Sequence, residues 1–286
     1  MKTPSRLEPL VVDGLVDRVV RQLMSGKEAT VYVVECGDAI RCAKVYKEAN
    51  KRAFRQAVDY TEGRKTKNSR QARAMKKGSG YGRNEQEAAW QHAEVDALYL
   101  LAAAGVRVPT PFNFHEGVVL MELVVDAAGE PAPRLNDVAL SSDDARRYHA
   151  FLVRQVVRML CAGIVHGDLS EYNVLVGVDG PVIIDLPQAI NAAANNNARR
   201  MLERDVDNLT AYFGQFAPDL LTTQYGKEIW SLYEAAQLQP DSELTGHFKT
   251  EEKHVDLDEV MQVIDAARSE DAARRARKAA ANARGD

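Results

Sequence analysis

One polar motif constrains this chain more than any other feature of its sequence. Residues 166–173 read His-Gly-Asp-Leu-Ser-Glu-Tyr-Asn, and Asp185 follows the asparagine after twelve residues, at the end of the apolar run 182–184. Asp168 and Asn173 are therefore five apart on a loop, and a short hairpin ending at Asp185 would bring all three side chains to one edge of a cleft. Turn formation or capping accounts for such residues singly, but their combined spacing favours a functional site.

Phosphoryl transfer is the chemistry that these side chains fit. It needs a carboxylate to orient and deprotonate the acceptor hydroxyl, and an amide and a second carboxylate to hold Mg²⁺ on the nucleotide phosphates. Asp168 is therefore the candidate catalytic base, and Asn173 and Asp185 are the candidate metal ligands. We count Asp185 among the catalytic residues as well.

The amino-terminal half supplies a basic and an acidic residue that this chemistry requires. Lys44 lies in a strand expected at residues 40–46, and Glu94 lies in a helix expected at residues 85–104. A strand lysine can neutralise phosphate oxygens while a glutamate fixes its direction. A lone lysine on a strand is usually only solvated, but the position of Lys44 favours the cleft.

A short loop before the first predicted hairpin could contact the phosphates. Residues 24–32 stand where a kinase has its glycine-rich loop, yet they contain one glycine. The Ser25 hydroxyl, the backbone amides around Gly26 and the Lys27 side chain are therefore the candidate ATP contacts. An ordinary turn leading into a strand explains the same residues equally well.

The best boundary between two lobes follows an apolar run. Residues 118–125 are apolar except for Glu122, and a linker with Gly129 and two prolines follows them. We expect the hinge here, and the resemblance of this segment to the hinge of a kinase implies that Met121, Glu122 and Val124 contact ATP.

Composition places few limits on the function. The chain has 286 residues, 45% of them hydrophobic, a net charge of -4 and three cysteines without a C-x-x-C pair. Global charge gives no reason to expect nucleic-acid or membrane binding, and the cysteines fit a reducing compartment. No apolar stretch approaches the roughly 18 residues of a membrane span, so we expect a soluble cytoplasmic protein.

The remaining segments give an α+β pattern. Strands are expected at 29–34, 40–46, 174–176 and 182–184, and helices at 85–104, at 141–162 and throughout the chain from residue 197. Residues 60–84 form a basic, glycine-rich insertion that cannot bury itself. The Ala/Arg-rich tail, residues 269–286, is expected to fray.

Four of these motifs, in order, resemble those of the RIO kinase family. The similar segments are residues 25–29 (the nucleotide loop), Trp90 with Glu94 (the αC signature), 121–123 with 131–135 (the hinge and its proline segment), and 166–175 with 184–188 (the catalytic and metal-binding motifs). Arg204, Asp205 and Asn208 also resemble an R-D-x-x-N helix of that family, although a helix-stabilising polar face explains them at least as well. The resemblance covers roughly residues 23–213.

The resemblance implies a reduced two-lobed protein-kinase-like fold. Residues 1–122 would form an N-lobe with an antiparallel sheet plus αC, and residues 123–268 a helical C-lobe. Leu186, Pro187 and Gln188 follow Asp185 where ordinary kinases have Phe-Gly, so an ordinary activation loop is not expected. The implied activity is that of a serine/threonine protein kinase, with autophosphorylation or ATPase cycling, that uses ATP and Mg²⁺ or Mn²⁺. The resemblance also implies that Asp185 could be transiently phosphorylated during turnover.

Two other classes of function stay open on the sequence. One is a nucleotide-gated assembly factor or binding module for a ribonucleoprotein, which the basic residues 64–83 favour slightly because they could contact RNA or a ribosomal particle. A solvated loop is the simpler interpretation of those residues. The other is a small-molecule phosphotransferase. The sequence does not name a protein substrate.

Overall fold

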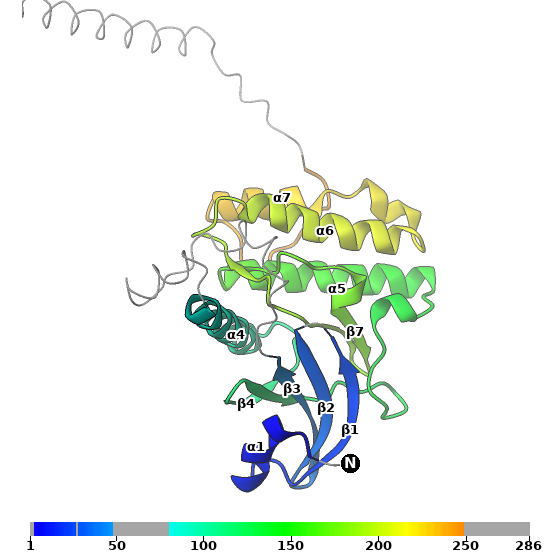
Figure 1. The fold of residues 1–286 in the computed structure, drawn as a ribbon. Coiled ribbons are helices and arrows are strands. Elements are labelled where there is room, and N and C mark those ends of the chain that lie inside the picture. The colour runs from blue at the N-terminus through cyan, green and yellow to red at the C-terminus, as the bar shows by residue number, and fades with distance from the viewer. Residues whose placement is uncertain (1–2, 27, 48–79, 249–286) are drawn as a thin grey trace, which may run out of the picture. The chain divides into compact units, whose positions relative to one another are not determined.

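The computed structural model describes residues 3–26, 28–47 and 80–248 (Figure 1). These residues belong to one compact unit, Met1–Phe248, and the second unit, Lys249–Asp286, lies outside them. The described α-helices are α1 (Glu8–Val12), α4 (Gly80–Ala103), α5 (Ser142–Cys161), α6 (Ala198–Gly214) and α7 (Tyr225–Glu234). The strands are β1 (Arg18–Ser25), β2 (Ala29–Cys36), β3 (Ala39–Tyr46), β4 (Pro111–His115), β5 (Val118–Glu122), β6 (Ile164–Val165), β7 (Val174–Gly177), β8 (Gly180–Ile183) and β9 (Ile190–Asn191). Short 3₁₀ turns lie at Ser5–Leu7, Leu135–Asp137, Glu171–Asn173 and Pro218–Thr222.

The amino-terminal part is a five-stranded antiparallel sheet in the order β1-β2-β3-β5-β4. Strand β3 is central, and Lys44 on it stands opposite Val31 of β2 and Val119 of β5. Because side chains alternate along a strand, Ala43 and Val45 pack into the apolar cluster around α1, whereas Lys44 and Tyr46 line a cleft on the other face. The alternation therefore places Lys44 on the face of the sheet that lines the cleft.

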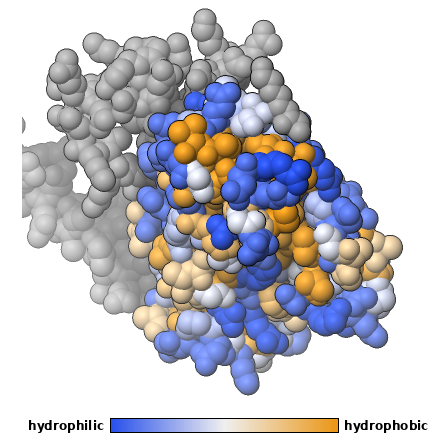
Figure 2. All heavy atoms as spheres, turned by 90° about the horizontal axis from the view of Figure 1, so that it is seen from below, coloured by the Kyte–Doolittle hydropathy of each residue, from blue (hydrophilic) through white to orange (hydrophobic). Residues whose placement is uncertain are grey.

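The face away from the cleft is covered by the first residues of the chain. Leu7 and Leu10 are fully buried and form one cluster with Val19, Tyr32 and Leu120. This amino-terminal helix and β1 were not predicted from the sequence. Most side chains of β1 are exposed, so its sequence lacks a clear alternation. Seen from the end of the molecule that carries α1, the surface is mainly hydrophilic, with apolar areas between (Figure 2).

Helix α4 begins earlier than predicted. It starts at Gly80 rather than at residue 85, so the prediction of an insertion that continues to residue 84 was wrong at its end. The remaining predicted insertion, through residue 79, lies outside the described residues. The carboxyl-terminal half of α4 packs Val95, Leu98 and Leu101 into the main core, and Gly105, with φ of 72°, follows the helix end as the sequence suggested.

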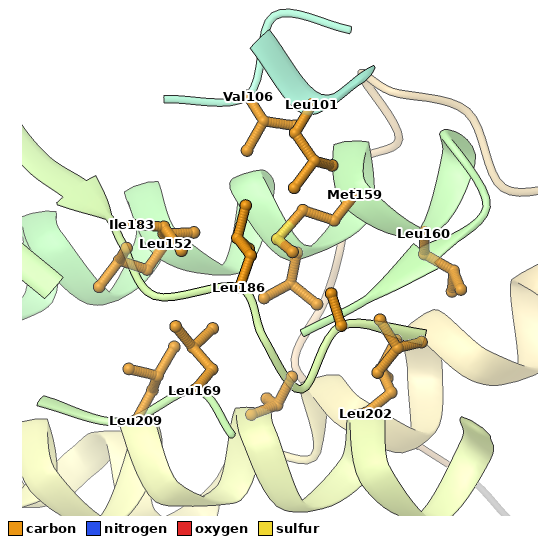
Figure 3. Close-up of a cluster of buried hydrophobic side chains, with 14 of the residues drawn as sticks. Leu101, Val106, Leu152, Met159, Leu160, Leu169, Ile183, Leu186, Leu202 and Leu209 are labelled. Carbon is orange, nitrogen blue, oxygen red and sulfur yellow. The ribbon is translucent and has the colours of Figure 1, made fainter. Parts of the chain in front are cut away.

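The helical part is built on α5 and α6. Ser141 caps α5 by accepting a hydrogen bond from the Asp144 N–H at 3.1 Å. Buried leucines of both helices meet side chains from α4 and from the loops between them, as Figure 3 shows for Leu101, Leu152 and Leu202. The predicted helix at 141–162 and the hairpin of β7 and β8 are confirmed.

The expectation of helix throughout residues 197–248 was wrong at its end. After α7, residues 235–248 are not helical, and both Ala236 (φ 55°) and Gly246 (φ 73°) have left-handed backbones. Pro240 also lacks the N–H that a helix interior requires. The boundary predicted after residue 122 and the fraying tail at 269–286 stay predictions, and the tail lies outside the described residues.

Candidate active site

A cleft of about 650 Å³ lies between the sheet and the helical part. Its lining includes Lys44 from β3, Glu94 from α4, and Asp168 and Asp185 from two loops of the helical part. The structure thus brings these four predicted site residues, from segments far apart in the sequence, to the same cavity as the predicted hinge residues Met121, Glu122 and Val124.

Lys44 joins the two sides of this cleft. Its Nζ lies 2.6 Å from Glu94 Oε1 and 3.2 Å from Asp185 Oδ1. The Lys44 and Glu94 side chains are 16% and 9% exposed, whereas Asp185 is 48% exposed and therefore open to a ligand. Burial by itself would lower the pKa of Lys44, but the nearby carboxylate charges of Glu94 and Asp185 and the hydrogen bond to Glu94 outweigh it and raise the pKa. The ammonium therefore stays charged.

Two cleft residues were missed by sequence reasoning. Glu28 lines the cleft at an exposed position, and partial desolvation of its carboxylate, followed by the charges of Asp185 and Glu94, raises its pKa. Tyr46 lies two residues after Lys44 on the same strand face, and burial, followed by the Glu94 charge, raises its pKa. Strand alternation could have identified Tyr46, and Glu28 lay inside the loop motif.

Asp168 and Asn173 are held in a loop that is tied to the segment before Asp185. Asn173 Nδ2 donates to the Asp168 carbonyl at 2.8 Å, and the Ile184 N–H donates to the Asn173 carbonyl at 2.9 Å. His166 Nε2 lies 3.1 Å from the Ile184 carbonyl. The spacing read from the sequence therefore corresponds to one hydrogen-bonded unit, in which Asp168 itself is exposed.

The residues next to the two aspartates anchor this unit in the core. Leu169 and Leu186 are buried among apolar side chains that Figure 3 labels. Asp185 has a φ of 67°, in the left-handed region that few residues other than glycine adopt. Backbone strain of this kind persists only where the surroundings impose it, and it is common at functional sites. The packing of Leu186 and this backbone together fix the position from which the Asp185 carboxylate extends.

Helix α6 makes hydrogen bonds to the same loop. Asp205 accepts hydrogen bonds from the Gly167 N–H at 2.7 Å and the Leu169 N–H at 3.0 Å, and it is almost fully buried. Arg204 donates to the Gly167 carbonyl, and Asn208 Nδ2 to the Leu169 carbonyl at 3.2 Å. These three residues are therefore more than a polar helix face. Burial raises the pKa of Asp205 to about 7, against the lowering effect of the two backbone N–H groups and Arg204.

The donor set fits a divalent cation shared with a ligand. Because Asn173 Nδ2 is used by the Asp168 carbonyl, the amide oxygen is the Asn173 atom that could coordinate a metal. No cluster of three or more His, Cys, Asp or Glu side chains with metal-binding geometry occurs in the described part of the chain. A cation held by Asp185 and Asn173 would need additional oxygen ligands, and Mg²⁺ typically takes these from phosphates and water.

The residues of the sheet side that were predicted to contact ATP do not all line the cleft. Met121 and Val124 line the cleft. The Ser25 hydroxyl instead lies 3.3 Å from Thr30 Oγ1 and 2.9 Å from Lys47 Nζ. Lys27 lies outside the described residues. The role of each in ATP binding stays a prediction.

Glu122 lines the cleft but its carboxylate binds protein groups. Arg107 donates to it through two nitrogens, at 2.8 and 2.6 Å, and Thr110 donates through its N–H and hydroxyl. Burial alone would raise the pKa of Glu122, but these hydrogen bonds outweigh it and lower the pKa. A ligand at this position would therefore meet the backbone rather than the carboxylate.

Arg107 also contacts two further segments through its own backbone. Its N–H donates to Gln155 Oε1 of α5 at 2.9 Å, and its carbonyl accepts from the Ile183 N–H of β8 at 2.9 Å. One residue thus connects the end of β5, the helix α5 and the strand that precedes Asp185.

Comparison with known proteins shows the family to which this chain belongs. A family model described as RIO domain matches residues 30–225, more than half of the chain. The chain belongs to the RIO domain family. It is 34% identical over 212 residues to the RIO-type serine/threonine-protein kinase Rio1 of Haloferax volcanii, covering 73% of this chain and 68% of that protein. It is 31% identical over 217 residues to the Rio1 kinase of Methanocaldococcus jannaschii, covering 74% and 70%.

Longer members of the RIO family match over a smaller share of their length. The human serine/threonine-protein kinase RIO1 is 26% identical over 225 residues, which are 78% of this chain but 38% of the human protein. A solved crystal structure of a kinase domain was also found, with a TM-score of 0.42 and 12% identity over 70% of this chain and 63% of that one.

The predicted family and fold class are therefore confirmed. The chain is a RIO-family member with a protein-kinase-like α+β fold, in which an antiparallel sheet and one long helix precede a helical region. Among the described residues, none of the helices is long and apolar enough to span a membrane.

Proposed function

We propose that this chain is an ATP- and divalent-metal-dependent serine/threonine protein kinase of the RIO type, which phosphorylates itself or another protein, or cycles through ATP hydrolysis. One observation carries the proposal. Lys44 is bonded to Glu94 and to Asp185 in a cleft that Asp168 also lines. This is the arrangement that phosphoryl transfer from a nucleotide requires.

Each residue of this arrangement has a proposed role. Lys44, directed by Glu94, would neutralise phosphate oxygens of the nucleotide. Asp185 and the Asn173 amide oxygen would hold the divalent cation, which supplies positive charge against the charge that develops on the phosphates. Asp168, exposed at the cleft, would accept the proton of the acceptor hydroxyl and orient its oxygen.

The nucleotide base would lie against the end of β5, where Met121 and Val124 line the cleft. The Glu122 carboxylate binds Arg107, and the Glu122 N–H donates to the Thr110 carbonyl. The Val124 carbonyl accepts from the Ala132 N–H, so the polar partners of the base would be other backbone groups of residues 122–124. Ser25 and Lys27 remain proposed phosphate contacts.

Further details of the function are also proposals. We infer Mg²⁺ rather than Mn²⁺ as the usual cation, because two protein oxygen ligands completed by phosphate oxygens and water are typical of Mg²⁺ sites. Contact with RNA or a ribosomal particle through residues 64–83 stays a hypothesis, since those residues lie outside the described part. A cytoplasmic location likewise stays a prediction.

Turnover of radiolabelled ATP tests the proposal. The wild type and Asp168→Ala are incubated with Mg²⁺, and free phosphate and protein-bound label are followed, with Asp179→Ala in the exposed β7–β8 turn as the matched control. We expect acid-stable, hydroxylamine-resistant label that is lost only in Asp168→Ala.

Other outcomes assign the site differently. Hydroxylamine-sensitive label with free phosphate would indicate an aspartyl-phosphate ATPase that uses Asp185. Nucleotide binding without any turnover would contradict the kinase proposal and favour a binding module. Rapid phosphorylation of a small hydroxyl compound, without protein label, would favour a small-molecule phosphotransferase.

A further inference from the structure

Lys47 makes contacts that neither the motifs nor the proposed mechanism uses. It follows the end of β3, three residues after Lys44. Its Nζ donates to the Gly26 carbonyl at 2.6 Å and to the Ser25 hydroxyl at 2.9 Å, and its backbone N–H donates to the Glu28 carbonyl at 2.8 Å. A single residue thus binds three acceptors of the turn between β1 and β2.

These contacts are made from outside the cleft. Gly26 and Glu28 line the cleft, whereas Lys47 and Ser25 are not among its lining residues in the described part of the chain. Lys47 therefore binds the turn without lining the cleft, and its exposed position lets its ammonium stay hydrated. Lysine suits this task because its compact ammonium has three donors that can serve acceptors in different directions.

The turn is also closed by its own hydrogen bonds. The Gly26 N–H donates to the Ala29 carbonyl at 2.9 Å, and the hydroxyls of Ser25 and Thr30 lie 3.3 Å apart. Because each peptide unit is planar, directing the Glu28 carbonyl at Lys47 also fixes the direction of the Ala29 N–H joined to it. A turn that approaches phosphates needs its backbone groups fixed in this way.

We propose that Lys47 is a positioning residue that holds the turn between β1 and β2 in the orientation that receives the nucleotide phosphates. The proposal rests on the proposed function, because it assumes that a nucleotide occupies the cleft. Lys47 acts through the turn and does not touch the reacting atoms. Its loss should therefore weaken binding of the phosphate part of a nucleotide and leave binding of the nucleoside part unchanged.

Binding of two ligands to the full-length chain tests this separation. Dissociation constants are measured by calorimetry for a non-hydrolysable ATP analogue with Mg²⁺ and for adenosine. Lys47→Met keeps the length of the side chain without its donors, Lys47→Arg keeps a charged donor, and Lys227→Met removes an exposed lysine of α7 as the matched control.

We expect Lys47→Met to bind the ATP analogue about fivefold more weakly, which corresponds to about 1 kcal/mol, and to bind adenosine as the wild type does. Lys47→Arg should recover most of the affinity, and Lys227→Met should match the wild type. Equal weakening for both ligands, or no weakening for the ATP analogue, would overturn the proposal.

Hydrogen exchange without nucleotide separates this proposal from the proposed function. In Lys47→Met, the backbone amides of β1 and β2 next to the turn should exchange faster than in the wild type and in Lys227→Met. Unchanged exchange there would also overturn the role of Lys47. A wild type that binds no ATP analogue would defeat the proposed function, and the exchange result would still show whether Lys47 orders the turn.

Discussion

The two loops that flank the cleft are held by different kinds of contact. The turn of residues 25–29 on the sheet side depends on the exposed side chain of Lys47. The loop of residues 166–173 on the helical side is held by the buried Asp205, by Asn208 and by the internal bond from Asn173 to Asp168. Exposed hydrogen bonds contribute little to stability, whereas buried hydrogen-bonded networks rigidify the groups they bind.

This difference matches what each loop has to do in the proposed mechanism. Asp168 must keep a fixed geometry toward the acceptor and the phosphate, so its loop gains from rigid support. The turn on the sheet side has to admit and release a nucleotide, and segments that move for binding are usually the less stable ones. The contrast therefore predicts unequal effects of equivalent substitutions on the two sides.

The largest expected effect comes from removing the buried anchor of the helical side. Asp205→Ala would leave the Gly167 and Leu169 N–H groups without their buried acceptor, which should lower the free energy of unfolding by roughly 3 kcal/mol and reduce ATP turnover by about 100-fold or more, as for other losses of site geometry. Urea unfolding and turnover assays measure both. Asp207→Ala, two residues along and exposed, is the control and should change neither by much. A stable, fully active Asp205→Ala would remove the contrast between the loops.

A loss of stability in acid, intermediate in size, is expected from the contact between α5 and α6. His149 of α5 is buried, with Nε2 3.0 Å from Thr210 Oγ1 of α6, and burial lowers its pKa to about 4. Because its pKa is lower in the folded state, its contribution to stability is complete above about pH 6.5 and is lost as the pH falls toward 4, by roughly 3 kcal/mol when the loss is complete. Urea unfolding between pH 4 and 7 measures this slope.

The pH dependence of the free energy of unfolding has to be compared between variants. The raised pKa of Asp205 acts in the opposite direction, because protonation of its carboxylate favours the folded state as the pH falls from about 7. His149→Gln removes only the histidine contribution, so it should lose less stability than the wild type between pH 6.5 and 4. His247→Gln, at an exposed position, should follow the wild type. If all three proteins have the same pH dependence, His149 does not make the helical side acid-sensitive.

The smallest effect is expected on the sheet side. Ser25→Ala removes one of the acceptors of Lys47 but leaves the Gly26 and Glu28 carbonyls bound, so the Michaelis constant for ATP should rise by no more than about threefold, in keeping with the small contribution of exposed hydrogen bonds. Steady-state kinetics measure it, with Ser25→Thr as the hydroxyl-retaining control. A loss of turnover as large as that of Asp205→Ala would mean that both loops are equally important to the geometry.

The motif loops could be predicted because their residue types carry chemistry at fixed spacing. The sequence predicted Asp168, Asn173 and Asp185 at one edge of a cleft and favoured the same cleft for Lys44, and in the structure Lys44 lies 3.2 Å from Asp185 and Asn173 is bonded to the Asp168 carbonyl. Helix signals were similarly local, as the cap at Ser141 shows.

The other contacts of the site could not be predicted, because they join segments that are distant in the sequence and leave no local signal. Lys47 contacts the turn about twenty residues earlier in the chain, and Asp205 contacts the loop of residues 166–173, nearly forty residues earlier. Glu122 was expected to face a nucleotide, yet its carboxylate binds Arg107, fifteen residues earlier in the chain. Strand β1 was missed because its mostly exposed side chains follow no period.

The contacts of Arg107 have a consequence for how the cleft could open. Its guanidinium donates hydrogen bonds to the carboxylate of Glu122, the last residue of β5, while its backbone is bonded to α5 and to β8. A rotation of the sheet away from the helices therefore either takes this residue as its axis or breaks one of these bonds. Release of a product from the cleft would then be a swinging movement about a fixed point rather than a separation of two halves.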